Sequence, residues 1–126
     1  MKLIILFKRL VLASLLISLF FVFSPFIISE SLKVTYFNNS VNKGDTFFLF
    51  VIIWILASFV SLYLLYNFKK PGKQMFLYVF LASIILTIFA GPIASDPIYY
   101  IIDGLGMAVS GALLVMLYYT PISKKF

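Results

Sequence analysis

The sequence predicts an all-α membrane protein whose four transmembrane helices form an antiparallel up-down bundle. Of its 126 residues, 63% are hydrophobic and 11% are charged, whereas soluble domains are about 45–50% apolar and about 25% charged. The apolar residues fall into four long runs, and most basic residues lie in alternate segments between them. A soluble globule of this size could not bury so many apolar side chains, so we expect lipid to be their solvent.

Each apolar run is long enough to cross a hydrocarbon core about 30 Å thick, which takes about 20 helical residues. The predicted spans form a single domain, residues 1–126, and cover residues 10–28, 47–66, 75–93 and 98–119. Backbone amides in lipid must be paired within the segment, which favours helices, and the strict alternation typical of a membrane barrel is missing. Asp45-Thr46 and Asp96-Pro97 are start signals for the second and fourth helices.

The connections between the spans predict that consecutive helices are antiparallel neighbours. Within the inner connection 67–74, Pro71-Gly72 indicates a tight turn. The outer connection 29–46 is the longest polar segment, and two interpretations of it stay open. It is either a connector on the membrane surface or a recognition loop for an extracytoplasmic partner. Pro25 is expected to kink or end the first span near its outer end.

The charges predict the orientation. If the N-terminus is cytoplasmic, eight of the ten basic residues lie inside, namely Lys2, Lys8, Arg9, Lys69, Lys70, Lys73, Lys124 and Lys125. This bias favours a multi-pass protein of the cytoplasmic (inner or plasma) membrane with both termini inside. The basic residues form short clusters beside the spans, so we expect them to contact anionic lipid headgroups and not nucleic acid.

A cleaved signal peptide is the alternative interpretation of the N-terminus. The first apolar run has 19 residues, however, which is longer than the 7–15 residues typical of a signal-peptide core.

The composition excludes several chemistries. The chain has no Cys and no His, which removes disulfides, thiolate nucleophiles and the usual haem and zinc ligands. Its four acids, Glu30, Asp45, Asp96 and Asp103, are too sparse to suggest a paired-carboxylate or calcium site. We therefore expect no enzyme activity, no cofactor and no metal.

Asp103 is the one ionisable residue inside a predicted span, about 9 Å below the outer helix end at 1.5 Å per residue. Charges within a bilayer are costly, so we expect polar partners, and Thr87, Trp54 and Ser24 fall at comparable depths. Three interpretations stay open. Asp103 is a helix cap at headgroup level if the crossing begins at Gly104, a structural hydrogen-bonding residue, or a proton or cation site.

Small residues recur at four-residue spacing in every span, as faces for close helix packing do. The predicted packing residues are Gly104, Ala108 and Ala112 in the fourth span and Ser83, Thr87 and Gly91 in the third, with Ser14, Ser18, Ala57 and Ser61 in the first two. We expect these faces to pack within the monomer and their hydroxyls to bond across helices. The surplus of small residues in the fourth span, at Gly106, Ser110 and Gly111, indicates a further partner.

Two hypotheses of function follow. The first is a non-enzymatic protein that packs against a partner membrane protein, as an accessory, assembly or immunity-type factor. In size and span number the chain is similar to some bacteriocin immunity proteins. The second is a homo-oligomeric small transporter or channel that uses Asp103 as its proton or cation site. Small multidrug transporters are similar in size but carry their essential glutamate in the first span, where this chain has no acid.

Overall fold

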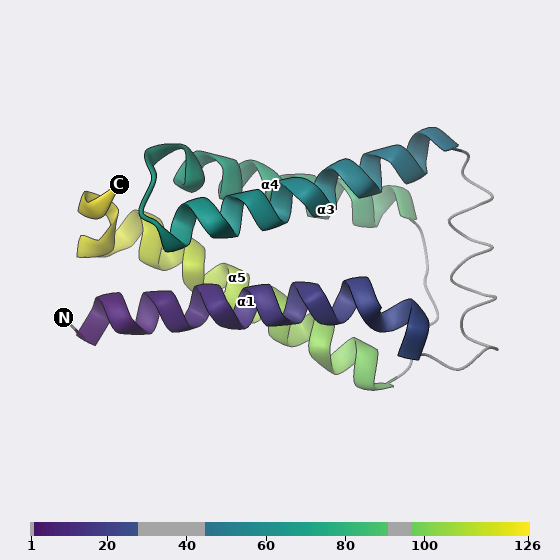
Figure 1. The fold of residues 1–126 in the computed structure, drawn as a ribbon, viewed down its shortest axis with the longest axis horizontal. Coiled ribbons are helices and arrows are strands. Elements are labelled where there is room, and N and C mark those ends of the chain that lie inside the picture. The colour runs from purple at the N-terminus through teal and green to yellow at the C-terminus, as the bar shows by residue number, and fades with distance from the viewer. Residues whose placement is uncertain (1, 28–44, 91–96) are drawn as a thin grey trace.

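The computed structural model describes residues 2–27, 45–90 and 97–126, and this part of the chain is all-helical (Figure 1). Its helices are α1 (Lys2–Ile27), α3 (Asp45–Tyr66), α4 (Lys70–Ala90), α5 (Pro97–Tyr119) and the short 3-10 helix η1 (Pro121–Lys125). The four long helices are each long and apolar enough to span a membrane. Within these residues, the prediction of an all-helical protein with four helices able to span a membrane is confirmed.

Helices α3 and α5 lie within two residues of the predicted spans at both ends, whereas α1 and α4 begin earlier than the predicted spans. Helix α1 begins at Lys2 and not at residue 10, so Lys8 and Arg9 are helical. Lysine and arginine can keep their aliphatic stems in apolar surroundings while their charged ends reach water, so charges near a span end do not stop a helix. Helix α4 likewise begins at Lys70 and not at residue 75. Residues 28–44 and 91–96, which include most of the predicted outer connection, lie outside the described residues.

The turn between α3 and α4 is made by Asn67, Phe68 and Lys69, so the predicted turn at Pro71-Gly72 is wrong. The Lys69 N–H donates to the Leu64 carbonyl at 2.9 Å, and the Phe68 N–H donates to the Leu65 carbonyl at 3.0 Å. This pair of bonds closes a helix in the Schellman arrangement, whose left-handed residue is usually glycine. Here that residue is Phe68, with φ 52°.

Gly72 has a packing role in place of the predicted turn role. It is buried in the first turn of α4, and an added Cβ would lie 2.8 Å from the Leu64 Cβ and 2.9 Å from the Leu64 carbonyl carbon. A side chain at this position would therefore push α4 away from α3. Pro71 fits the same turn because an N–H there has no intrahelical acceptor.

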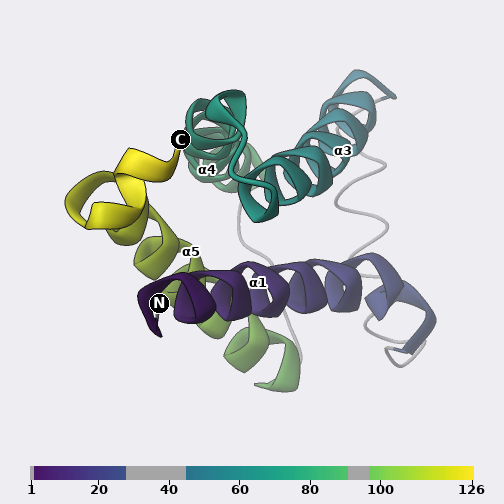
Figure 2. The ribbon, with the colours of Figure 1, turned by 60° about the vertical axis from the view of Figure 1, so that its left-hand side comes forward.

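The long helices associate as two pairs, and consecutive helices along the chain run in opposite directions (Figures 1 and 2). Helix α3 packs most extensively on α4, and α1 packs mainly on α5, which crosses it obliquely. Helices α4 and α5 barely touch, although the short connection between them predicts that they are neighbours. The two pairs are joined by contacts between α1 and α3.

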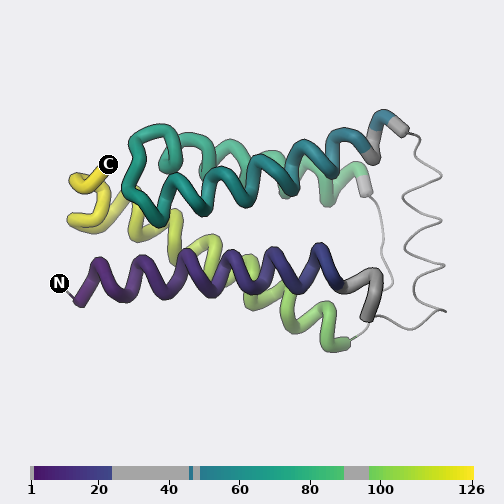
Figure 3. The backbone as a smooth tube through the Cα atoms, in the orientation of Figure 1, coloured from purple at the N-terminus to yellow at the C-terminus, as the bar shows by residue number. Residues whose placement is uncertain are grey.

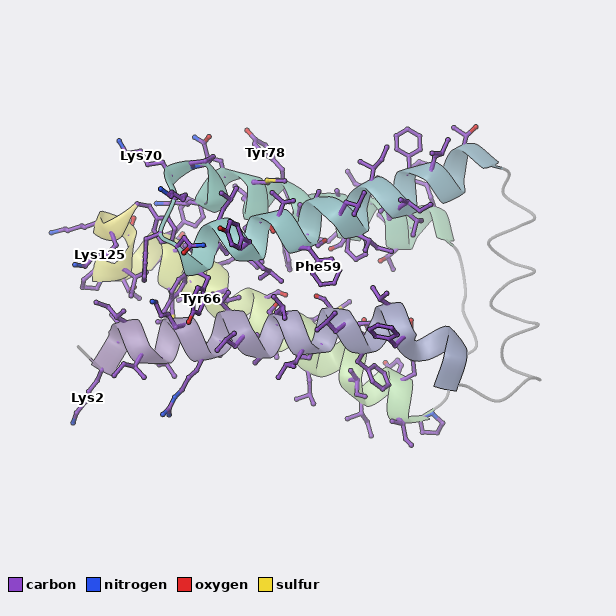
Figure 4. All side chains as sticks on the ribbon, viewed as in Figure 1. Lys2, Phe59, Tyr66, Lys70, Tyr78 and Lys125 are labelled. Atoms are coloured by element: carbon purple, nitrogen blue, oxygen red, sulfur yellow. The ribbon has the colours of Figure 1, made fainter. Side chains whose placement is uncertain are left out.

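The buried core lies at one end of the bundle, which we call the lysine end because Lys2, Lys70 and Lys125 project there (Figure 4). Both termini and the α3–α4 turn lie at this end (Figure 1). The buried apolar residues are Phe7, Val11, Leu62, Leu65, Phe76, Leu113, Met116, Leu117 and Ile122. No described residue in the opposite halves of the long helices is buried, and the two pairs diverge toward this far end (Figure 3).

Candidate functional site

Helix α5 has one packed face and one open face. Its packed face includes Gly106, Val109, Leu113 and Leu117, of which Leu113 and Leu117 are fully buried. On the other side of the helix, the predicted packing residues Gly104, Ala108 and Ala112 are all exposed. The structure therefore gives these three residues no packing role inside the monomer.

The glycines of α5 show how its two faces differ in the space around them. An added Cβ at Gly106 would lie 3.2 Å from the Ile17 Cγ2 of α1, so Gly106 allows the two helices to cross closely. An added Cβ at Gly104 or Gly111 would meet nothing within 4 Å. Gly106 thus serves the fold, whereas the space beside Gly104 and Gly111 is unfilled by this chain.

The small residues of the first two predicted spans behave differently from those of α5. Ser14 of α1 and Ser61 of α3 are buried in the core at the lysine end. On α4, Ser83 is half-buried and Thr87 is exposed, while Gly91 lies outside the described residues. Ser14 and Ser61 are therefore buried within the monomer, whereas Thr87 of α4 and Gly104, Ala108 and Ala112 of α5 are exposed on its surface.

The helix hydroxyls bond within their own helices and not across helices as predicted. Ser18 donates to the Ser14 carbonyl at 2.9 Å, and Ser61 donates to the Ser58 carbonyl at 2.8 Å. Ser83 and Thr87 each donate to a carbonyl of α4. Such local bonds satisfy a hydroxyl in lipid without a neighbouring helix, because the carbonyl three or four residues earlier is within reach.

Asp103 is exposed one residue before Gly104, in the first two turns of α5. The donors predicted for it are used elsewhere. The Trp54 indole N–H donates to the Val79 carbonyl at 3.0 Å, and the Thr87 hydroxyl donates to the Ser83 carbonyl at 2.8 Å. The Ser24 side chain lies outside the described part of the structure. The structure thus does not join Asp103 to Trp54 or Thr87 by a hydrogen bond.

The described residues contain no group of three or more acids, histidines or cysteines that could hold a metal ion. Within the same ranges, every buried side-chain nitrogen or oxygen has a hydrogen-bond partner. The feature of α5 that could bind another molecule is therefore its open apolar face, which has small side chains and one carboxylate beside it. Such a face can take part in close helix packing.

Sequence reasoning missed a cluster of aromatic and basic side chains at the lysine end. The rings of Phe7, Phe68 and Phe126 contact one another, with centroids 5.4–6.0 Å apart. Lys73 Nζ donates to the Ser123 Oγ at 2.8 Å and lies 4.4 Å from the centre of the Tyr118 ring. These contacts tie the turn, η1 and the C-terminal residue to the core. The apolar Ile122 and Phe126 among the lysines of the tail were the signal available in the sequence.

Comparison of the chain with protein-family models, with curated proteins and with solved structures finds no match. The proposals below therefore stand on the residues of this chain and their geometry.

Proposed function

We propose that the protein is a non-enzymatic membrane protein that binds a transmembrane helix of a partner protein through the open face of α5. Its main support is the contrast between Gly106, which packs on Ile17, and Gly104, which faces open space. Lipid tails are as apolar as leucine, so helix association in a membrane depends on close packing, which small residues permit. An accessory, assembly or immunity-type factor would act through such a face.

The proposal includes an orientation. The lysine end lies in the cytoplasm, so both termini are inside and the far end faces outward. This assignment is supported by the eight of ten basic residues that belong to the segments of the lysine end, since basic residues are retained on the cytoplasmic side. The membrane is the cytoplasmic, inner or plasma, membrane. The partner helix would then meet α5 in the outer half of the bilayer, where Gly104 lies.

The test is site-specific photo-crosslinking in native membranes. A photoreactive residue at Ala108, in the middle of the open face, should give one discrete protein adduct. The matched control position is Leu16, which is exposed near the middle of α1 on a surface that it shares with the exposed Leu12 and Phe23. A reagent at Leu16 should react with lipid and give no discrete protein adduct.

A second variant ties the adduct to close packing. Gly104→Leu should lower the yield of the Ala108 adduct about tenfold, because overpacking an interface typically costs about 1–3 kcal/mol. The fold should be unaffected, since an added Cβ at Gly104 meets nothing in the chain. The proposal would be overturned if Ala108 and Leu16 gave the same adducts, or if Gly104→Leu left the yield of the Ala108 adduct unchanged.

The second candidate function is a homo-oligomeric transporter or channel. Asp103 is exposed directly beside Gly104, so association of two copies through α5 would bring their carboxylates to the interface. A crosslinked adduct with the mass of two chains, together with ion or proton flux in liposomes that Asp103→Asn abolishes, would favour this function. No flux by the wild-type protein, or flux that Asp103→Asn leaves unchanged, would exclude it.

A further inference from the structure

A groove of about 610 Å³ lies between α3 and α4, and the proposed function does not use it. From α3 it is lined by Phe50, Trp54 and Ala57, and from α4 it is lined along most of the helix, from Pro71 to Leu86. Almost all of this lining is apolar. Tyr78 and Ile85, which also line it, are exposed by 68% and 54%, so the groove is open along its side to the surrounding lipid.

The groove is long enough for one acyl chain. Pro71 and Leu86 are fifteen residues apart on α4, which is about 22 Å at 1.5 Å per residue. Half of a hydrocarbon core about 30 Å thick is about 15 Å. The groove thus begins at the lysine end and is longer than one leaflet of acyl chains is thick.

The floor of the groove is held together by its one tryptophan. The Trp54 N–H donates to the Val79 carbonyl at 3.0 Å, so this bond joins α3 to α4 and leaves the indole without a free donor. Ala57 and Ala82 supply the width, because their side chains end at Cβ. An apolar, unbranched ligand fits this lining better than a polar one.

The end of the groove at the lysine end is positively charged. Lys69 and Lys70 are exposed there, and Lys70 immediately precedes Pro71 of the lining. In Figure 4, Lys70 and Tyr78 project from the same outer side of α4, away from α1. The positive end of the α4 helix dipole lies at the same place. The one acidic residue of this hairpin is Asp45, at the start of α3, so no carboxylate follows it in sequence before Lys69 and Lys70.

Lys73 belongs to a different surface. Its Nζ is bonded to the Ser123 Oγ and lies over the Tyr118 ring, so it is turned toward η1 and α5. Lys70, together with Lys69, is therefore the cation that an anionic headgroup at the groove would meet. From this charge complementarity and the long apolar lining, we propose that the groove binds an anionic phospholipid. One acyl chain lies against Trp54 and Ala82, and the phosphate lies at Lys70.

The test uses Trp54, the one tryptophan of the chain, as the reporter. The full-length protein is placed in phosphatidylcholine vesicles that contain a minor fraction of phosphatidylglycerol with brominated acyl chains. Bromine quenches indole fluorescence on contact. Brominated phosphatidylglycerol should quench Trp54 more strongly than the same fraction of brominated phosphatidylcholine. Equal quenching by the two lipids would overturn the proposal.

Two variants separate the groove from general surface charge. Lys70→Gln should lower the preference for phosphatidylglycerol about fivefold, which is what one lysine near an anionic surface contributes. Lys125→Gln removes the same charge from η1 at the same end and should leave the preference unchanged. Equal losses in both variants would show general surface attraction and overturn the proposal.

A third variant tests the apolar part of the groove. Ala82→Leu fills the groove and should reduce quenching of Trp54 by both brominated lipids, with helix content unchanged by circular dichroism. Quenching that stays at the wild-type level would place the acyl chain elsewhere. Because the Lys70→Gln comparison leaves the lining intact, it remains decisive if Ala82→Leu does not fold. The test does not involve the open face of α5, so its failure would leave the proposed function untouched.

Discussion

The lysine end and the far end of the bundle are the two halves of the same four apolar helices, yet among the described residues only the lysine end contains buried ones. At the lysine end, all the long helices and η1 contribute to one core. At the far end, the described parts of the helices are exposed or half-buried and the pairs diverge (Figure 3). The comparison shows that apolar composition does not determine where the helices pack.

Shape and anchoring explain the difference between the two ends. Gly72 allows α3 and α4 to approach closely beside the turn. The Phe68 ring of the turn and the ring of the C-terminal residue Phe126 both pack against the core. A non-glycine residue in the left-handed region costs about 1 kcal/mol, and the packing of the Phe68 ring offsets this cost. At the far end, the Phe21 ring contacts the rings of Phe20 and Tyr99, which joins α1 to α5 only, and none of these three residues is buried.

The largest effect is expected from removing a ring of the core. Phe7→Ala should lower the free energy of unfolding by about 3 kcal/mol, because Phe7 is fully buried and truncation leaves a cavity. Phe23→Ala changes the same residue type on the same helix at the far end, where Phe23 is exposed. It should change the free energy of unfolding by less than about 0.5 kcal/mol. Titration with a denaturing detergent in mixed micelles measures both values, and equal losses would contradict the comparison.

The next effect comes from adding one methyl group. Gly72→Ala should destabilise the protein by about 2 kcal/mol, since its Cβ would overlap the Leu64 side chain and carbonyl carbon. Gly104→Ala adds the same atom where nothing lies within 4 Å and should not destabilise the fold. Thermal unfolding in detergent compares the two variants. A stable Gly72→Ala protein would show that α3 and α4 do not need this close approach.

A smaller effect is expected for the link between α4 and η1. Lys73→Gln removes the Ser123 hydrogen bond and the contact with the Tyr118 ring, and should cost about 1 kcal/mol. Lys70→Gln is the matched control, because Lys70 is exposed three residues earlier on the same helix. In a titration with denaturing detergent, Lys70→Gln should keep the wild-type free energy of unfolding. If both variants lose the same stability, the cause is overall charge and not the contacts of Lys73.

The smallest effect is expected for the indole bond between α3 and α4. Trp54→Phe keeps an aromatic ring but removes the donor to the Val79 carbonyl. The expected loss is about 0.6 kcal/mol, which is the average for hydrogen bonds between helices in membranes. The refolding equilibrium in mixed micelles, followed by circular dichroism, measures this difference. A loss as large as that of Phe7→Ala would mean that the far part of the hairpin is as firmly packed as the lysine end.

The candidate site was only partly predictable. Sequence identified Gly104, Ala108 and Ala112 as small residues at packing spacing, but it could not show that α5 turns Gly106 toward α1 and leaves Gly104 open. Periodicity gives the face that residues share, whereas the neighbour of that face depends on the contacts of the whole bundle. In the same way, matching depth suggested Trp54 and Thr87 as partners of Asp103. Their hydrogen bonds go to backbone carbonyls instead.

The sequence by itself determined the four helices able to span a membrane and the ends of α3 and α5, because backbone pairing in lipid leaves an apolar run of about 20 residues few structures other than a helix. Only the tertiary structure decided that α5 packs on α1, that Gly72 serves packing and not a turn, and that the core gathers at the lysine end. The physical reason is that lipid solvates apolar side chains equally well on every face of a helix. The choice between faces is then made by close fit between specific side chains, which no single helix carries in its own sequence.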